Sequence, residues 1–151
     1  MSEIERLVWH EVAPHGARAL FGVHHYVTTG TNLPEEMIHL VFLRVSQING
    51  CAHCIDLHTR DLLKTMPLDK VVLLPVWAEV PHLFNPQYRA ALAWAEEVTR
   101  VSETHASDEA YAAAAAVFEP RDLVDLTIAI AAMNAFNRLG APFRLPVKAK
   151  A

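Results

Sequence analysis

The sequence predicts an all-α protein of about six to eight helices. Helical periodicity of apolar residues recurs along the chain, whereas strict apolar–polar alternation never extends beyond about five residues. The chain has 151 residues, of which 52% are hydrophobic and 20% charged, enough to bury a core. We therefore expect one all-α domain spanning residues 1–151.

Glycine, proline and capping residues set the bounds of the first predicted helices. In chain order, the helices are predicted over residues 15–29, 34–48, 51–64, 68–79, 88–101, 107–118 and 120–139. Gly30 ends the first helix, and the proline and acids at 34–36 open the second, because these residues are favoured in a first turn. Asn49-Gly50 then separates the second helix from the third, which begins at Cys51.

Prolines and a serine define the later helices. Pro75 interrupts the fourth helix, since proline breaks the hydrogen bonding of a helix interior. Ser107 opens the alanine-rich helix and Pro120 opens the last long one. We expect that last helix to stop before Gly140 and Pro142 and to be followed by an extended tail.

Composition argues against nucleic-acid and membrane partners. The formal net charge is −4, and no run of lysines and arginines forms a basic stripe. The longest apolar run, VVLLPVWA at 71–78, is broken by a proline and is far too short to cross a bilayer. The N-terminal residues lack the apolar segment of a secretion signal. We expect a cytoplasmic protein.

The segment SQINGCAHCIDLH, residues 46–58, holds both cysteines of the chain. Cys51 and Cys54 are three residues apart on one helix face, so their sulfurs can form a disulfide with little backbone adjustment. His58 follows Cys54 by four residues and lies within reach of its sulfur, whereas His53 projects from another side of the helix.

The position of these cysteines at a helix start favours thiol chemistry. Unpaired N–H groups and the helix dipole stabilise a thiolate there, and a neighbouring imidazole lowers the thiol pKa further or takes its proton. A thiolate beside a second thiol can reduce a peroxide: one sulfur becomes a sulfenic acid and the other condenses with it to a disulfide.

Zinc binding is the main chemical alternative. Cys51, Cys54 and His58 could ligate zinc, but the sequence offers no second Cys-x-x-Cys or His-x-x-x-His pair. We therefore predict no metal and no cofactor. The remaining histidines outside this region are interpreted as surface or core residues: His10, His15, His24, His25, His82 and His105.

The segment LRVSQINGCAHCIDLHTRDLLK, residues 43–64, resembles the core motif of the alkylhydroperoxidase D and carboxymuconolactone decarboxylase superfamily. Residues 74–99 and 134–144 also resemble segments of its short members. The resemblance implies an all-helical homo-oligomer, often a trimer or hexamer, that reduces hydroperoxides with its cysteine pair. The electron donor is then a small dithiol reductant, a dihydrolipoyl protein or a thioredoxin-like protein.

The resemblance also implies a role for each residue of the motif. Cys54 corresponds to the peroxidatic cysteine, activated through His58. Cys51 corresponds to the resolving cysteine and is the expected point of attack for the external reductant. His53 corresponds to a histidine of the proton network.

One position departs from the family pattern. The family's proton relay includes a glutamate twelve residues before the first cysteine, and here that position is His39. A carboxylate would hold the imidazole of His58 in the right tautomer and stabilise its cation. A second imidazole can hydrogen-bond to His58 but does not supply that charge. Glu35 and Glu36 stand one helical turn earlier, and we expect a relay Cys54–His58–water–His39–Glu36.

Other functions remain open at this point. A decarboxylase acting on a lactone acid needs no cysteine pair, and its acid-binding candidates would be Arg44, Arg60 and Arg138. A thiol–disulfide sensor or adaptor would use the same cysteines without efficient turnover. For a peroxidase we expect an apolar substrate pocket, with Phe42, Trp77 and Phe136 as candidate lining residues.

Overall fold

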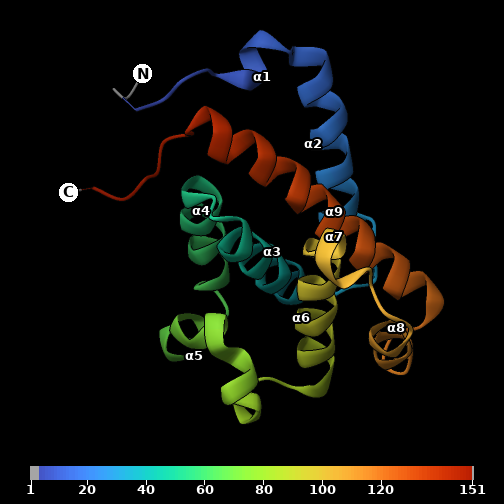
Figure 1. Ribbon diagram of the computed structural model, residues 1–151. Coiled ribbons are helices and arrows are strands. Elements are labelled where there is room, and N and C mark those ends of the chain that lie inside the picture. The colour runs from blue at the N-terminus through green and yellow to red at the C-terminus, as the bar shows by residue number, and fades with distance from the viewer. Residues whose placement is uncertain (1–3, 151) are drawn as a thin grey trace.

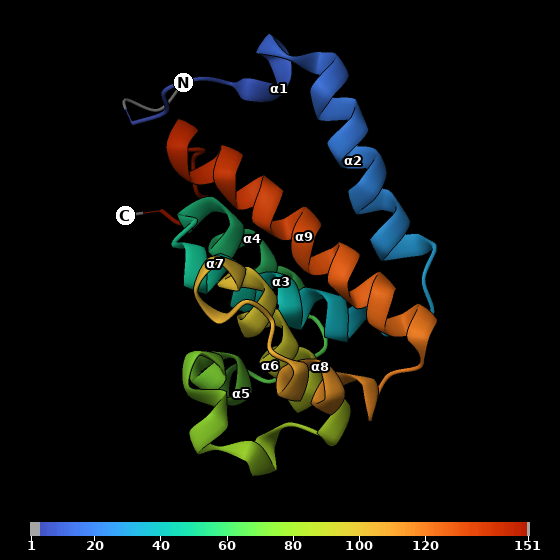
Figure 2. The same cartoon turned by 45° about the vertical axis from the view of Figure 1, so that its right-hand side comes forward.

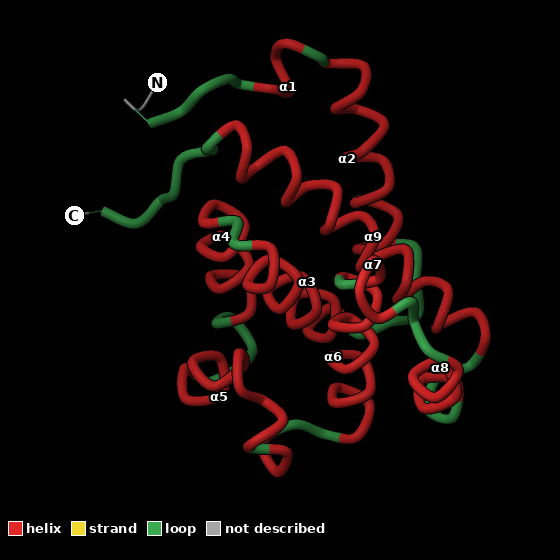
Figure 3. Tube along the Cα trace, viewed as in Figure 1, coloured by secondary structure: helices red, strands yellow, loops and turns green. Residues whose placement is uncertain are grey.

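The computed structural model of the protein describes residues 4–150, which form helices and loops and no strand (Figures 1 and 3). The α-helices are α1 (Trp9–Val12), α2 (Pro14–Thr29), α3 (Glu35–Asn49), α4 (Ala52–Leu62), α5 (Leu68–Leu73), α6 (Pro86–Thr99), α7 (Val101–Thr104), α8 (Asp108–Ala115) and α9 (Pro120–Phe143). Two 3₁₀ helices, η1 (Leu74–Glu79) and η2 (Pro81–Leu83), follow α5. The predicted all-α class is confirmed, and no helix in the described part is long and apolar enough to cross a membrane.

The predicted helices correspond to α2, α3, α4, α5 with η1, α6, α8 and α9. Pro75 interrupts the fourth predicted helix as expected, because the chain changes there from α5 to the 3₁₀ turns of η1. The four-residue helices α1 and α7 were not predicted, since one turn is too short to show a periodic pattern.

The prediction that the last helix stops before Gly140 is wrong, because α9 continues to Phe143. Pro142 lies in its last turn, where the ring removes only one helical hydrogen bond. The N-terminal segment supplies other partners there: the backbone N–H of Arg6 donates to the Phe143 carbonyl at 3.0 Å, and its guanidinium donates to the Pro142 carbonyl at 3.1 Å. Arg144, in the left-handed region at φ 51°, then ends the helix.

Helix α3 is the centre of the fold and packs against α4, α6 and α9 (Figure 2). Its buried residues lie on almost all sides of the helix, as expected for a helix inside a core. These residues are Met37, Ile38, Leu40, Val41, Phe42, Leu43, Val45 and Ser46. A large apolar cluster joins α3 to α6 and α9 and includes both cysteines, so the motif lies against the core.

A buried carboxylate links α2 to α9. Asp125 of α9, only 1% exposed, accepts a hydrogen bond from the Tyr26 hydroxyl at 2.7 Å and one from Arg121 at 3.0 Å. Arg121 also donates to the Tyr26 hydroxyl oxygen at 3.0 Å. This link holds α2 beside α9 at the end of α9 remote from the cysteines (Figure 1).

We predict that Asp125→Ala lowers the free energy of unfolding by about 2–3 kcal/mol, because it leaves the Tyr26 hydroxyl and Arg121 without their charged partner. Tyr26→Phe removes one hydrogen bond and should cost about 1 kcal/mol. Urea unfolding of the two variants measures both values. An Asp125→Ala protein no less stable than Tyr26→Phe would contradict this account of the link.

Candidate active site

A glycine turn places the two cysteines at the start of α4. Gly50 ends α3 in the left-handed region at φ 68°, a conformation that favours glycine. The next residue, Cys51, caps α4: its sulfur accepts a hydrogen bond from the backbone N–H of Cys54 at 3.3 Å. Its own N–H donates to the Ser46 carbonyl at 3.1 Å, which fastens the turn to the last turn of α3.

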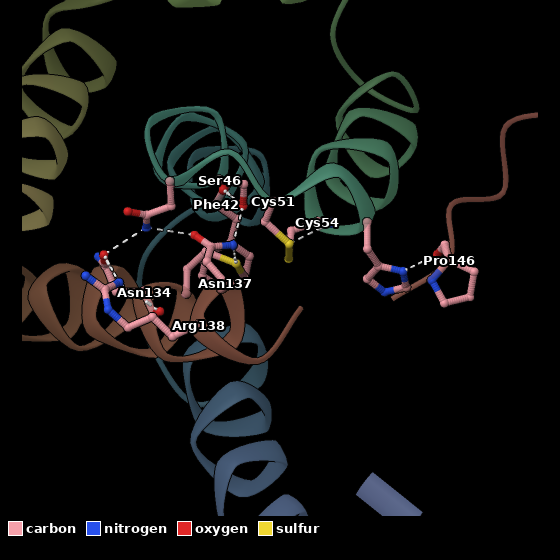
Figure 4. Close-up of a disulfide and its surroundings, with 11 residues drawn as sticks. Phe42, Ser46, Cys51, Cys54, Asn134, Asn137, Arg138 and Pro146 are labelled. Atoms are coloured by element: carbon pink, nitrogen blue, oxygen red, sulfur yellow. Dashed lines mark hydrogen bonds between the residues drawn. A yellow bond between two sulfur atoms is a disulfide. The ribbon is translucent and has the colours of Figure 1, made fainter. Parts of the chain in front are cut away.

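Cys51 and Cys54 form a disulfide (Figure 4). Helix α9 passes very close to it at Gly140, where a Cβ atom would lie 2.7 Å from the Cys51 sulfur and 3.2 Å from the Cys54 sulfur. Cys51 is completely buried and Cys54 is 5% exposed. Only a residue without a side chain fits between this part of α9 and the sulfurs.

Polar side chains join α3 to α9 beside the disulfide (Figure 4). Asn137 of α9 donates to the Ser46 hydroxyl at 3.0 Å and accepts from Asn49 at 3.0 Å. Asn49 also donates to Asn134 at 2.9 Å. Because Asn137 and Ser46 are almost fully buried, these bonds fix how α9 sits over the cysteine turn.

An apolar cavity of about 410 Å³ opens next to Cys54. Its wall is built from the segment before α1, from α1, α2, α4 and α9, and from the tail after α9. The lining residues are Glu5, Trp9, His10, Phe21, His24, His53, Cys54, Leu57, His58, Met133, Phe136, Leu145 and Pro146. Cys54 belongs to this wall and Cys51 does not, so Cys54 is the sulfur that a molecule in the cavity meets.

The two histidines of the motif both reach the cavity. His58 is buried, with its ring centroid 5.1 Å from that of Phe42. The Nδ1 atom of His53 lies 2.6 Å from the Pro146 carbonyl, so His53 contacts the tail after α9. Asp56 holds the same tail by accepting a hydrogen bond from the Lys148 backbone N–H at 2.7 Å.

His39 lies beside His58 on the neighbouring helix, with ring centroids 6.1 Å apart. The carboxylate that faces both rings is Asp61, whose Oδ2 lies 3.9 Å from each Nδ1 atom. Glu36, expected in this relay, instead accepts a hydrogen bond from the Tyr88 hydroxyl at 3.0 Å. Sequence reasoning missed Asp61, although its position three residues after His58 on one helix was a usable signal.

Burial keeps His58 uncharged. Burial, followed by the positive charge of a protonated His39, lowers the pKa of His58 to about 3, against the opposing effect of Asp61. Burial and His39 also lower the pKa of His24. Burial alone would raise the pKa of Asp61, but the hydrogen bond from Lys64 and the neighbouring His39 lower it overall. Asp61 is therefore the negative charge next to a neutral His58 at pH 7.

Within the described part of the chain, His39, His58 and Asp61 are the group placed to hold a metal ion, with donor atoms within 4.8 Å of one another. Ligands of one tetrahedral zinc ion stand about 3.4 Å apart. The two nitrogen–oxygen separations here are 3.9 Å, wider than that value. The cysteines are bonded to each other, so the zinc site considered from the sequence is not formed.

The predicted pocket residues are partly placed at the cavity. Phe136 lines it, whereas Phe42 is buried behind His58, and Trp77 lies elsewhere and donates its indole N–H to Glu96 at 2.9 Å. Trp9, Phe21 and the histidines His10 and His24 line it without having been predicted. No local pattern marks these residues, because their contacts come from distant segments.

We predict that Gly140→Ala destabilises the oxidised protein by about 1–3 kcal/mol, because the added Cβ forces α9 away from two buried sulfurs. Gly22→Ala on α2 is the matched control, since a Cβ there meets nothing within 4 Å. It should leave stability unchanged or raise it by up to about 1 kcal/mol. Denaturant unfolding distinguishes the two, and equal effects of both substitutions would refute the close-contact argument.

We predict that burial of neutral His58 makes the protein less stable as pH falls from about 6.5 toward 3. In this window His58 binds a proton in the unfolded chain but not in the folded protein. The free energy of unfolding therefore falls by up to about 1.4 kcal/mol for each pH unit. Unfolding free energies of wild type and His58→Gln should therefore converge as pH falls. The control is His82→Gln, at an exposed position, whose difference from wild type should not change in the same way. A difference in unfolding free energy between wild type and His58→Gln that stays constant with pH would contradict the prediction.

Comparison with known proteins agrees with this architecture. The model of the carboxymuconolactone decarboxylase family matches residues 14–97. An uncharacterized protein of Bacillus subtilis (strain 168), YdfG, is 31% identical over 136 residues, which cover 89% of this chain and 91% of that protein.

Two solved structures extend the similarity to the fold. One is ATU0492 from Agrobacterium tumefaciens, a protein of unknown function that is described as a candidate antioxidant defence protein AhpD. Its TM-score is 0.91, its sequence identity is 33%, and the match covers 97% of this chain and 99% of that one. The other is an uncharacterized peroxidase-related protein with an alkylhydroperoxidase AhpD core, from Ralstonia eutropha JMP134. Its TM-score is 0.74, its sequence identity is 20%, and the match covers 93% of this chain and 75% of that one. Given its cysteine motif, its fold and these matches, the chain belongs to the carboxymuconolactone decarboxylase family, within the superfamily that includes the alkylhydroperoxidase D proteins.

Proposed function

We propose that the protein is a thiol-dependent reductase of organic hydroperoxides with a role in antioxidant defence. The observation that carries this proposal is the position of the disulfide: Cys54 forms part of an apolar cavity wall, and Cys51 lies fully buried behind it. The sulfur that meets a substrate thus has a partner sulfur within bonding distance, out of the substrate's reach.

The reaction proceeds in three balanced steps. The Cys54 thiolate attacks the peroxide, the O–O bond breaks, one oxygen remains on Cys54 as a sulfenic acid, and the alkoxide leaves as an alcohol after taking a proton. The Cys51 thiol then attacks the sulfenic sulfur, so that a disulfide forms and water leaves. A dithiol reductant finally returns two electrons and two protons to the cysteine pair.

His58 is placed to transfer the protons of the first step. It lines the cavity with Cys54 and is neutral at pH 7, so it can accept the thiol proton and return it to the leaving alkoxide. His53, on the same wall, is proposed to take part in this network.

The character of the cavity favours an apolar substrate. Its lining includes Trp9, Phe21 and Phe136 and contains neither lysine nor arginine. The arginines considered for an acidic lactone are engaged elsewhere: Arg44 with Glu96, Arg60 with Asp56, and Arg138 with Asn134. These contacts weigh against the decarboxylase alternative.

The reductant and the assembly are part of the proposal. The family resemblance implies that the reductant attacks Cys51, but Cys51 is fully buried whereas Cys54 lines the cavity. We propose instead that a slender dithiol, such as a small molecule or a dihydrolipoyl arm, attacks Cys54 through the cavity. We infer that the protein forms a homo-oligomer, as expected from the family.

We predict that Cys54→Ser abolishes even the first oxidation by cumene hydroperoxide, because the attacking sulfur is lost. Cys51→Ser should consume one equivalent of peroxide and then stop, because no thiol resolves the sulfenic acid. Peroxide consumption by the reduced variants after removal of the dithiol, together with mass spectrometry of Cys54, measures these outcomes.

The wild-type protein, assayed with excess dithiothreitol, separates the two redox functions. Continuous peroxide consumption supports the reductase, whereas a single stoichiometric oxidation to the disulfide would replace it with the thiol–disulfide sensor. The reverse behaviour of the two serine variants would exchange the roles of the cysteines.

A further inference from the structure

His58 also faces two polar residues that do not line the cavity. Its Nδ1 atom faces Asp61, three residues later on α4, and His39 on α3. The Nδ1 atoms of both histidines are buried and have no hydrogen-bond partner among the described residues. An unpaired buried imidazole nitrogen costs about 1–3 kcal/mol, so this arrangement requires a partner for both rings.

The distances indicate a shared water molecule. Each Nδ1 lies 3.9 Å from Asp61 Oδ2, too far for a direct hydrogen bond, and one donor atom from each of the three residues lies within 4.8 Å of the other two. A water oxygen can lie about 2.8 Å from two atoms that stand 3.9 Å apart, with an angle of about 90° between the two contacts. A site with three polar groups at such separations suits a bridging water.

The surroundings determine which atoms of this network carry hydrogen. The Nε2 atom of His39 lies 3.6 Å from Glu35 Oε1, which favours a proton on Nε2 and leaves Nδ1 as an acceptor. Asp61 accepts a hydrogen bond from Lys64 at 2.7 Å through Oδ1, so Oδ2 remains free to accept. The water then donates both its hydrogens, to His39 Nδ1 and Asp61 Oδ2, and can only accept from His58.

We propose that Asp61 and the Glu35-oriented His39 act as positioning residues that hold His58 in the tautomer with hydrogen on Nδ1. This leaves the lone pair on Nε2, the nitrogen available on the cavity side, since Nδ1 is shielded and His58 lines the cavity. Nε2 then takes the proton of the Cys54 thiol, and Asp61 stabilises the resulting imidazolium until the alkoxide receives that proton.

This assignment rests on the proposed function for its purpose, but it fixes a ground-state property that can be measured without peroxide. Long-range ¹H–¹⁵N correlation spectra of histidine-labelled protein at pH 7.5 report which nitrogen of each ring is protonated, with His58 assigned by its absence in His58→Gln. We expect hydrogen on Nδ1 of His58 and on Nε2 of His39. In Asp61→Asn the His58 signals should shift toward the other tautomer, and Asp61→Glu should restore them.

Three spectroscopic results would overturn the assignment. The first is hydrogen on Nε2 of His58 in the wild type. The second is a His58 tautomer that is unchanged in Asp61→Asn. The third is a His58 tautomer that changes in Glu36→Gln but not in Asp61→Asn. One equivalent of zinc in protein purified without added metal, lost in Asp61→Asn, would equally overturn it by making the three residues metal ligands.

Kinetics of the reduced protein connect the tautomer to the reaction. Asp61→Asn should slow the first oxidation by cumene hydroperoxide about 10–100-fold, with recovery in Asp61→Glu. Asp69→Asn, an exposed aspartate at the start of α5, is the matched control and should react as wild type does. An inactive wild type would remove the proposed function while the spectra still decide the tautomer. If Asp61→Asn alters the His58 tautomer but reacts as fast as wild type, the proposed contribution of Asp61 to proton transfer is wrong.

Discussion

The contact between Gly140 and the disulfide is the constraint on which the candidate site depends. Because this residue lacks a Cβ, α9 can lie directly against both sulfurs, and the buried Asn137 holds it there. The end of α9 then delivers Leu145 and Pro146 to the cavity wall, and its last carbonyls bind Arg6 of the N-terminal segment. Both ends of the chain are thus brought to Cys54 by one close helix approach.

This way of building the cavity sets the polarity around the Cys54 sulfur. Aromatic and aliphatic side chains from both chain ends surround Cys54 and leave His58 in a poorly solvated position, where a positive charge is costly. A histidine in such a position is a useful proton carrier only if a nearby negative charge compensates its cation. Asp61 is the carboxylate that faces it, so burial and charge compensation are two parts of one arrangement.

Local patterns predicted the helices and the cysteine turn, because periodicity, glycines and prolines act within a few residues. The end of α9 was mispredicted because its stop signals are offset by Arg6, a residue more than a hundred positions away. The cavity wall was largely missed for the same reason. The error in the predicted relay, which named Glu36 where the structure has Asp61, has a different cause. Both carboxylates stand at helical spacing from a candidate histidine, and only the packing of α3 against α4 shows which of them faces both rings.

The same packing gives a physical meaning to His39. In the family pattern a carboxylate at this place on the preceding helix would face His58 directly, whereas here the negative charge comes from α4 and an imidazole fills the remaining space. On the proposed arrangement the inner end of the network is buried at His58, and its outer ends are the exposed Glu35 and Lys64. Protons can then exchange with solvent on the side away from the cavity, so that proton transfer does not require water to enter the apolar space that holds the substrate.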